Sequence, residues 1–347
     1  LIADSNTWKV AGKAVLESFL NEKVPMLQPI VFEVPPLLHA DYSNVERILK
    51  ETEPYPEAIL ISVGSGTIND LVKTASFKRG WPYMAIGTAA SMDGYCSAGA
   101  SLSVNGRKQT LDCSAPKVII ADTDILQATP AKYTAAGYGD LASKLTAGAD
   151  WIIADFTGDD PIEEYAWNII QPPLAGWLAE PEKLAAGDPE KVAGIFEGLN
   201  CGGLAMQALG RSRAASGAEH MFSHIWDMTN HRGADGDPVS HGFQVSLGII
   251  CVTALMEEVF KIEADDIDIG RAVSLYPSWP ERSKQIEEIM KELPSWEEYI
   301  DICREKHLSP EELEKKLKAV KAGWNTLRER VWSKLPGYQE MKKMLQL

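Results

Sequence analysis

Short apolar runs alternate with helical patterns through the first 121 residues, and few folds are compatible with such a series. We expect strands at 28–34, 58–63, 83–86 and 118–121, and helices at 44–51 and 69–77. A strand–helix–strand series favours βαβ units, in which the strands are parallel and the helices cover the sheet. The sequence therefore predicts an α/β domain with a mostly parallel sheet.

A hairpin and a change of pattern complete the predicted organisation. Residues 102–104 and the run after Arg107 flank Asn105-Gly106, a dipeptide that fits a two-residue type I′ turn. After Ala128-Thr-Pro130, long helical patterns are separated by clusters of Gly, Pro and Asp. We therefore predict an α/β domain over residues 1–128 and an all-helical domain over residues 129–347.

Composition excludes several classes of partner. A net charge of −15 argues against nucleic acid and anionic membranes, because both require clustered positive charge. No run approaches ~18 consecutive apolar residues, so no membrane span is expected. Five cysteines without a C-x-x-C pair predict reduced thiols and a cytoplasmic location. The chain begins inside an apolar run and without methionine, which suggests that an N-terminal segment is missing.

Four of the six histidines fall between residues 216 and 248. Ser216-Gly-Ala-Glu219 has the form of a capping box, so we expect a helix from Gly217 with His220 and His224 one turn apart on one face. His241 follows a turn-rich segment that is long enough to fold back beside that face. The alternative is that these are ordinary polar positions near helix ends, and His231 is expected at the surface.

A carboxylate strengthens the metal-site interpretation of this cluster. Asp140 stands at the start of another predicted helix, in a mostly small and apolar setting. Two imidazoles and one carboxylate leave an open coordination position, as a catalytic zinc or non-haem iron site requires. Because Asp140 is distant from the histidines in sequence, spacing alone leaves this grouping open.

Two weaker signals for nucleotide binding lie in the N-terminal domain. Residues 59–70 read as a strand, a Gly-Ser-Gly turn and a helix, and the amides of such a turn can bind pyrophosphate. Asn69 stands where G-x-G-x-x-G has its third glycine, so a βα turn without a ligand is also consistent. Asp4 follows a predicted strand, where its carboxylate could accept bonds from ribose hydroxyls or cap the next helix.

Three motifs together resemble the iron-containing alcohol dehydrogenase superfamily: Gly137-Tyr-Gly-Asp140, Ser216-Gly-Ala-Glu-His220-x-x-x-His224 and His241-Gly242. The longer run from Gly210 to His224 resembles its sn-glycerol-1-phosphate dehydrogenase branch, which has proline where this chain has Ala214. The resemblance implies a dehydroquinate synthase-like fold, in which residues 1–128 form a Rossmann-like nucleotide-binding domain and residues 129–347 an all-helical metal and substrate domain. It also implies that Asp140, His220 and His241 are catalytic metal ligands, and that Asp93, Asp140 and His224 contact the substrate.

The same resemblance implies a dinucleotide, NAD or NADP, and one divalent metal ion. Zinc is favoured, and iron or nickel also suits these ligands. The positions expected to contact the dinucleotide are Gly66, Thr67, Ile68, Asn69, Asp70, Thr88, Ala89, Ala90, Ser91 and Ser97, with Asp4 added from its place at a strand end.

The resemblance further implies a homo-oligomeric enzyme that interconverts dihydroxyacetone phosphate and sn-glycerol 1-phosphate. The alternatives are a glycerol dehydrogenase, another polyol or alcohol dehydrogenase or an NAD-using lyase of the superfamily, or a binding protein without catalysis. Lys144, Arg213 and the backbone amides near Gly217 are candidates for binding the phosphate dianion. For the two cations, an ion pair with Asp140 and a surface salt bridge are the respective alternatives.

Overall fold

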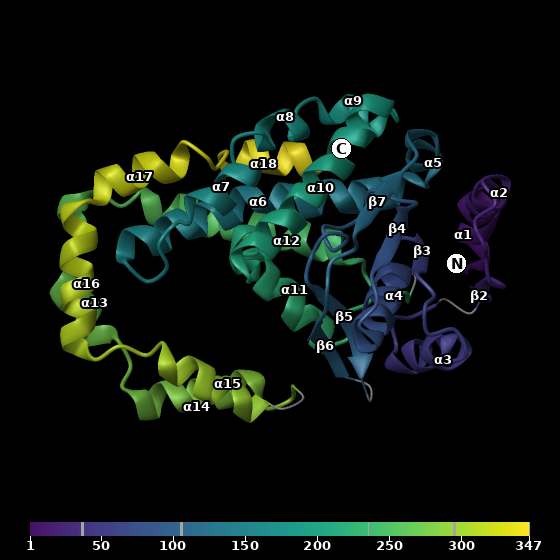
Figure 1. Cartoon of the computed structure of the whole chain (residues 1–347). Helices are drawn as coiled ribbons and strands as arrows, with labels where there is room; N and C mark the ends of the chain where they lie inside the picture. Colours follow the sequence, from purple (N-terminus) through teal and green to yellow (C-terminus); the bar gives the residue numbers. More distant parts are fainter. Residues whose placement is uncertain (36–37, 105–106, 235, 294–295, 347) are drawn as a thin grey trace.

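The computed structural model describes residues 1–35, 38–104, 107–234, 236–293 and 296–346 (Figure 1). Its N-terminal half is built on a parallel sheet of five strands in the order β2-β1-β3-β4-β7. These strands are β1 (Ile2–Asp4), β2 (Ile30–Phe32), β3 (Leu60–Gly64), β4 (Tyr83–Gly87) and β7 (Val118–Ala121). The parallel sheet predicted from the alternating pattern is therefore confirmed.

The strand register aligns the carboxyl ends of the strands at one edge of the sheet. Gly64 pairs with Gly87, and Gly87 pairs with Ala121, so β3, β4 and β7 end level with each other. The strand order reverses direction between β1 and β3, where the connections leave toward opposite sides. In open α/β sheets, ligands bind outside the carboxyl ends of the strands at such a point. This edge is therefore the expected place for a nucleotide.

Helices cover both faces of the sheet. On one face, α3 (Tyr42–Thr52) and α4 (Gly66–Arg79) bury apolar side chains such as Val45 and Leu71 against the strands. On the other face, α1 (Ser5–Thr7) continues through a π-helical turn into α2 (Lys13–Asn21), and Ala11 joins a smaller core with Val63. A sheet buried on both faces explains why its strands read as nearly continuous apolar runs.

The predicted hairpin forms a separate two-stranded sheet. β5 (Gly99–Val104) and β6 (Arg107–Asp112) pair antiparallel, and Val104 lies opposite Arg107. The type I′ turn predicted at 105–106 lies outside the described residues. β5 packs beside α3 and α4, which brings the start of the hairpin close to the core of the N-terminal half.

The C-terminal half is helical. Its central helix, α6 (Ala131–Thr157), is preceded by α5 (Thr123–Ala128), whose last residue is the predicted domain boundary. Around α6 pack α10 (Pro189–Leu209), α11 (Ala218–Met228) and α12 (His241–Phe260), with the short helices α7 (Glu164–Ile170), α8 (Leu174–Leu178) and α9 (Pro181–Ala185) at one side. This part of the chain therefore has the all-helical character predicted from its sequence.

α12 is the most apolar of these helices. By length and composition it could cross a membrane, but 44% of its apolar window is buried, and it packs on α6, α11 and α18 (Tyr338–Leu345). These contacts are typical of a core helix in a helical bundle.

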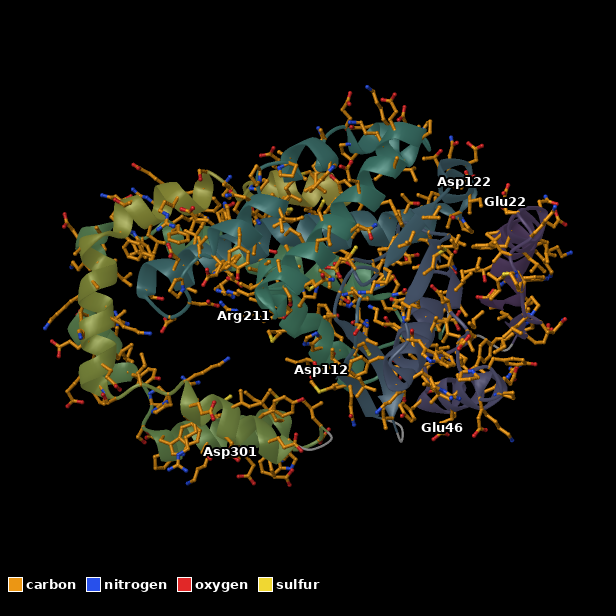
Figure 2. The ribbon with its side chains drawn as sticks, viewed as in Figure 1. Glu22, Glu46, Asp112, Asp122, Arg211 and Asp301 are labelled. Atoms are coloured by element: carbon orange, nitrogen blue, oxygen red, sulfur yellow. The ribbon has the colours of Figure 1, made fainter. Side chains whose placement is uncertain are left out.

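The helices from α13 to α17 form an extension that leaves the helical bundle and comes back to it. α13 (Ile269–Leu275), α14 (Trp279–Met290), α15 (Trp296–Glu305) and α16 (Pro310–Ala322) extend away from the bundle, and α17 (Trp324–Trp332) leads back to it (Figure 1). Acidic side chains such as Glu22, Glu46, Asp122 and Asp301 lie at the periphery (Figure 2). The large negative charge of the chain is thus carried in part by its surface.

Candidate metal and substrate site

Asp140 lies well inside α6 (Ala131–Thr157), so the prediction that it stands at the start of a helix is wrong. Glycines near it let neighbouring segments approach closely. A Cβ atom at Gly137 would lie 1.9 Å from a carbonyl oxygen in segment 88–93, which follows β4. A Cβ atom at Gly242 would lie 2.0 Å from the carbonyl oxygen of Ala136. Because neither space could hold a side chain, these glycines allow α6 to contact both the carboxyl edge of the sheet and the first turn of α12.

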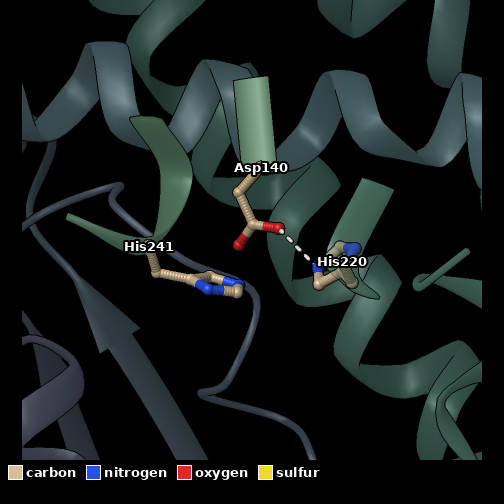
Figure 3. Close-up of side chains that lie close together, drawn as sticks. All are labelled: Asp140, His220 and His241. Atoms are coloured by element: carbon tan, nitrogen blue, oxygen red, sulfur yellow. Dashed lines mark ion pairs between the residues drawn. The ribbon is translucent and has the colours of Figure 1, made fainter. Parts of the chain in front are cut away.

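Three side chains from three helices meet at this place (Figure 3). Asp140 from α6, His220 from α11 and His241 from α12 each offer a ligand atom, and these atoms lie within 4.8 Å of one another. Oδ1 of Asp140 is 3.9 Å from Nε2 of His220. Asp140 and His220 are buried, and His241 is half-buried. Two nitrogen donors and one oxygen donor in a partly enclosed space suit a divalent transition metal ion such as zinc.

Neighbouring polar groups fix the orientation of both histidine rings. Nδ1 of His220 lies 2.8 Å from Oε1 of Glu219, and Nδ1 of His241 lies 3.2 Å from Oγ of Ser223. The Glu219 carboxylate also accepts a bond from the hydroxyl of Thr146. Burial alone would raise the pKa of Glu219, but the contact with His220 and bonds from backbone N–H groups together outweigh burial and lower it. Such outer partners direct the other ring nitrogen of His220 toward the cluster.

A buried lysine joins this cluster to the N-terminal half. Nζ of Lys144 donates to Oδ2 of Asp93 at 2.7 Å and to Oδ1 of Asp140 at 2.9 Å. The backbone N–H of Asp93 donates to Oδ2 of Asp140 at 3.0 Å. Asp93 belongs to the segment that leaves the carboxyl edge after β4, so these bonds connect the sheet edge directly to the ligand cluster.

The pKa values of this group follow from burial and mutual charge. Burial alone would raise the pKa of Asp140, but the Lys144 ammonium and the two histidines outweigh it and lower the pKa to about 2. Burial, followed by the charge of Asp140, raises the pKa of Asp93 despite Lys144. Burial alone would lower the pKa of Lys144, but the two carboxylates raise it. Asp140 is therefore ionised and ready to bind a cation.

The predicted phosphate contacts are not supported by this arrangement. Lys144 is fully buried between two carboxylates, and Arg213 contacts Asp160 at 3.3 Å and the backbone oxygen of Asp150 at 2.9 Å. The ion-pair alternatives for both cations thus describe the structure. The backbone amides at the start of α11 are also engaged by protein carboxylates, so that proposal was wrong for the same reason.

The capping box predicted at Ser216 is also wrong. The N-cap of α11 is Gly217, and no side chain of that residue can accept the first amides. Asp150, from α6, accepts the N–H of Ala218 at 2.6 Å, and Glu219 accepts the N–H of Gly217 at 2.6 Å. A carboxylate from another helix therefore replaces the local hydroxyl, an interaction that the sequence of α11 does not contain.

The other histidines of the cluster lie outside the ligand group. His224 is exposed on α11, and its ring centroid is 6.5 Å from that of His220. This position is next to the candidate metal site and open to a substrate. His231 is exposed, with its ring centroid 6.2 Å from that of Trp226, as predicted for a surface position.

The Gly-Ser-Gly turn lies at the carboxyl end of β3, and α4 begins at Gly66. The first amides of a helix lack intrahelical partners and can bind a pyrophosphate. Oγ of Ser65 lies 2.6 Å from Oγ of Ser91, which joins this turn to segment 88–93. Within that segment Thr88, Ala89 and Ala90 are buried, and Ser91 is half-buried. Both predicted cofactor segments therefore lie together at the sheet edge.

Some predicted cofactor residues make internal contacts instead of facing outward. Asn69 is fully buried and bonds to Tyr83 and to the carbonyl oxygen of Gly94. Asp70 accepts the N–H of Ser101, and Oγ of Ser97 lies 3.2 Å from Nζ of Lys73. Dinucleotide contacts by these side chains remain predictions.

Asp4 caps the helix that follows β1. Its Oδ1 accepts the backbone N–H groups of Asn6 and Thr7, both at 2.8 Å, and the Thr7 hydroxyl completes a capping box. The capping alternative is therefore observed. Asp4 also ends β1 at the carboxyl edge of the sheet, so the predicted ribose contact stays open.

Sequence reasoning overlooked two groups that support the site. Glu219 was interpreted as a capping residue, although its position directly before His220 is the signal for a side chain that orients a ligand. Asp150 gave no signal, because its partner at the start of α11 is 68 residues away.

Comparisons with known proteins agree with this site. Residues 1–130 match the family of iron-containing alcohol dehydrogenases. The chain is 32% identical over 306 residues to glycerol-1-phosphate dehydrogenase (NAD(P)+) of Bacillus subtilis, which covers 88% of this chain and 74% of the relative. A relative of the same name from Pyrococcus furiosus is 35% identical over 249 residues, covering 72% and 68%.

Solved structures show the same fold at low identity. Glycerol dehydrogenase from Schizosaccharomyces pombe superposes with a TM-score of 0.57 at 17% identity, covering 94% of this chain and 84% of that one. An iron-containing alcohol dehydrogenase from Thermococcus thioreducens gives a TM-score of 0.56 at 15% identity, covering 99% and 90%. The fold is thus that of the iron-containing alcohol dehydrogenases, a dehydroquinate synthase-like fold. Within that class, the chain belongs to the glycerol-1-phosphate dehydrogenase family.

The ligand assignment is tested by removing single histidines. His220→Ala and His241→Ala should each lose bound metal, because the two remaining ligands would hold an ion poorly. Elemental analysis after dialysis measures the metal content per chain. His231→Ala, at the exposed histidine, is the matched control and should keep its metal. Full occupancy in the His220 variant would refute the assignment.

The buried carboxylate of Asp150 predicts a pH-dependent stability. Burial raises its pKa to about 6, above the unfolded value of 3.8, so the free energy of unfolding should fall as the pH rises from 4 to 6. Asp150→Asn keeps an oxygen acceptor for Ala218 but removes the charge. It should therefore be more stable than the wild type at pH 8 by about 1–3 kcal/mol, and this gain should shrink at pH 5.

Urea unfolding at the two pH values measures this difference. Asp155→Asn is the control, because Asp155 lies on the same helix but its pKa is lowered by a hydrogen bond from Arg330. That variant should gain no stability at pH 8. If Asp150→Asn also gains none there, the Asp150 carboxylate is not destabilising in the folded protein.

Proposed function

We propose that this chain is a metal-dependent, NAD(P)-linked dehydrogenase that interconverts dihydroxyacetone phosphate and sn-glycerol 1-phosphate. The observation that carries this proposal is the cluster of Asp140, His220 and His241, held against the carboxyl edge of a nucleotide-binding type of sheet. The relatives from Bacillus subtilis and Pyrococcus furiosus bear the name of this activity. Their names also support NAD(P) as the cofactor.

A divalent ion held by Asp140, His220 and His241 would supply a Lewis acid for the ketone oxygen, and the dinucleotide would supply the hydride. The donor set fits zinc, and iron or nickel is also compatible. Lys144 keeps Asp140 ionised at neutral pH, since the pKa of that carboxyl is about 2. Glu219 and Ser223 orient the two imidazoles, so the ligand atoms need little rearrangement to bind an ion.

The nucleotide is proposed to lie along the carboxyl edge. The amides at the start of α4, at Gly66, Thr67 and Ile68, would meet the pyrophosphate, and the segment from Thr88 to Ser91 would lie beside it. Gly64 makes this turn possible, because a Cβ atom there would lie 2.7 Å from Cβ of Ile68. This arrangement supports a dinucleotide between the sheet edge and the metal cluster.

The substrate is proposed to bind between Asp93 and His224. The Asp93 carboxylate pairs with Lys144 beside Asp140, and His224 stands at the exposed side of the cluster. Both side chains could hold hydroxyl groups of a three-carbon substrate. Because Lys144 and Arg213 are engaged in ion pairs, the phosphate is proposed to be bound by other donors.

We further propose a cytoplasmic homo-oligomer. Several large apolar side chains of α12 are exposed, namely Phe243, Leu247, Leu255 and Val259. Exposed apolar side chains that gather on a surface are typical of an area covered by another subunit.

Substrate preference tests the function directly. We expect kcat/KM for dihydroxyacetone phosphate to exceed that for dihydroxyacetone by at least ~100-fold, or about 3 kcal/mol of transition-state binding. NADH oxidation at 340 nm over a panel of ketones measures this ratio. His224→Ala should lower the activity while the metal stays bound. Equal efficiency on both ketones would instead assign the chain as a glycerol dehydrogenase.

A conservative change at Asp4 separates its two proposed roles. Asn is as good an N-cap as Asp, so Asp4→Asn should preserve the helix but remove the charge that would repel a 2′-phosphate. The ratio of the dissociation constants for NADPH and NADH, measured by fluorescence titration, should fall in this variant. An unchanged ratio would show that Asp4 serves only as a cap.

A further inference from the structure

α4 buries a lysine that takes no part in the ligand cluster. Lys73 is fully buried, two turns after the Gly-Ser-Gly turn on the same helix. The carboxylate of Asp70 lies 3.7 Å from its Nζ, which is too long for a hydrogen bond. An ammonium group in such a place needs other partners, because burying a charge without hydrogen bonds is costly.

Those partners all come from one short segment of the chain. Nζ of Lys73 donates to the carbonyl oxygens of Gly94 at 2.6 Å and Gly99 at 2.9 Å, and it lies 3.2 Å from Oγ of Ser97. The Ser97 hydroxyl itself contacts the same two carbonyl oxygens, both at 3.0 Å. The lysine therefore draws both ends of segment 94–99 together around one charge.

This segment directly follows the residue that connects the two halves of the site. Asp93 donates its N–H to Asp140 and pairs its carboxylate with Lys144. Gly94, the next residue, is held by Lys73 and also by the amide of Asn69, at 3.4 Å. Because one peptide bond separates the two anchor points, the position of the Gly94 carbonyl restricts the position of Asp93.

Other contacts extend the same restraint along α4. Asp70 accepts the N–H of Ser101 at 3.1 Å, so a second polar side chain of this helix anchors β5 just after the segment. On the opposite side, a Cβ atom at Gly203 of α10 would lie 2.7 Å from the carbonyl oxygen of Asp93. The segment is thus confined between α4 and α10, and Lys73 provides the charged contact of this enclosure.

We propose that Lys73 is a positioning residue for the reaction: its ammonium fixes segment 94–99 and so sets Asp93 against Asp140 and the substrate. This inference rests on the proposed function, in which Asp93 contacts the substrate. Burial lowers the pKa of Lys73, and nearby anionic groups, Asp70 first, oppose this effect. The bonds to the carbonyl oxygens stabilise the charged form, and a neutral side chain of equal length would not replace them.

The test replaces Lys73 by methionine, which has a similar length but no donors. With metal-loaded protein, kcat for dihydroxyacetone phosphate should fall at least about tenfold and KM should rise. The dissociation constant for NADH and the bound metal should each change by less than about twofold, since neither the turn at Gly66 nor the metal ligands contact Lys73. Lys78→Met, at the exposed end of the same helix, is the control and should match the wild type.

An unchanged kcat in a folded Lys73→Met protein would overturn the inference. So would a loss that falls equally on metal content and NADH binding, because that result indicates general destabilisation. Lys73→Gln retains two donors and should recover part of kcat.

Ser97→Ala covers the case in which the Lys73 variants do not fold. It removes the hydroxyl beside Nζ without burying an unpaired charge, and it should lower kcat in the same direction by a smaller factor. If it instead weakens NADH binding and leaves kcat unchanged, Ser97 is a dinucleotide contact and the positioning role is refuted.

Failure of the proposed function gives a different result. A wild-type protein without activity on the ketone panel would refute the function. The positioning of Asp93 would then be judged by hydrogen exchange of its backbone amide, which is bonded to Asp140. Faster exchange in Lys73→Met than in Lys78→Met is expected, and equal exchange would refute the positioning of Asp93 by Lys73.

Discussion

The two halves of the molecule meet around one buried ammonium group. Lys144 is fully buried and lies between the carboxylates of Asp93 and Asp140. Breaking such a buried pair typically costs about 3–5 kcal/mol, because the remaining charge stays unpaired. The ionised carboxylate of Asp140, with His220 and His241 beside it, gives the site a physical preference for a cation. The same lysine thus holds the halves together and sets the charge of the ligand group.

Close helix packing determines where these charges lie. The glycines of the two motifs, Gly137 and Gly242, allow α6 to touch segment 88–93 and the start of α12 without intervening side chains. An alanine at either position would force a backbone shift, since its Cβ atom would overlap a carbonyl oxygen. These glycines therefore have a packing role, and their consequence is that Asp140 comes within reach of both histidines.

The sequence predicted the elements better than it predicted their partners. Strands such as 60–64 were recognisable because a sheet covered on both faces requires continuous apolar runs. The spacing of His220 and His224 correctly placed both one turn apart on the same helix, but only the family resemblance distinguished His220, the predicted metal ligand, from His224. Lys144 was a candidate for phosphate binding because burial and the distant Asp93 cannot be read from local spacing. The prediction of a capping box for α11 was wrong for a similar reason, because Asp150, which accepts the N–H of Ala218, comes from another helix.

Two helices, one from each half, connect the expected cofactor position to the expected substrate position. α4 begins at the Gly-Ser-Gly turn and, two turns later, holds segment 94–99 through Lys73. α6 carries Asp140 and Lys144 on successive turns. Between them, Asp93 bonds to both residues of α6 and directly precedes the segment held by α4. The position of a dinucleotide at the first turn of α4 would therefore be fixed relative to a metal ion at Asp140 by two helices and one short, enclosed segment. Hydride transfer requires such a fixed geometry between its partners.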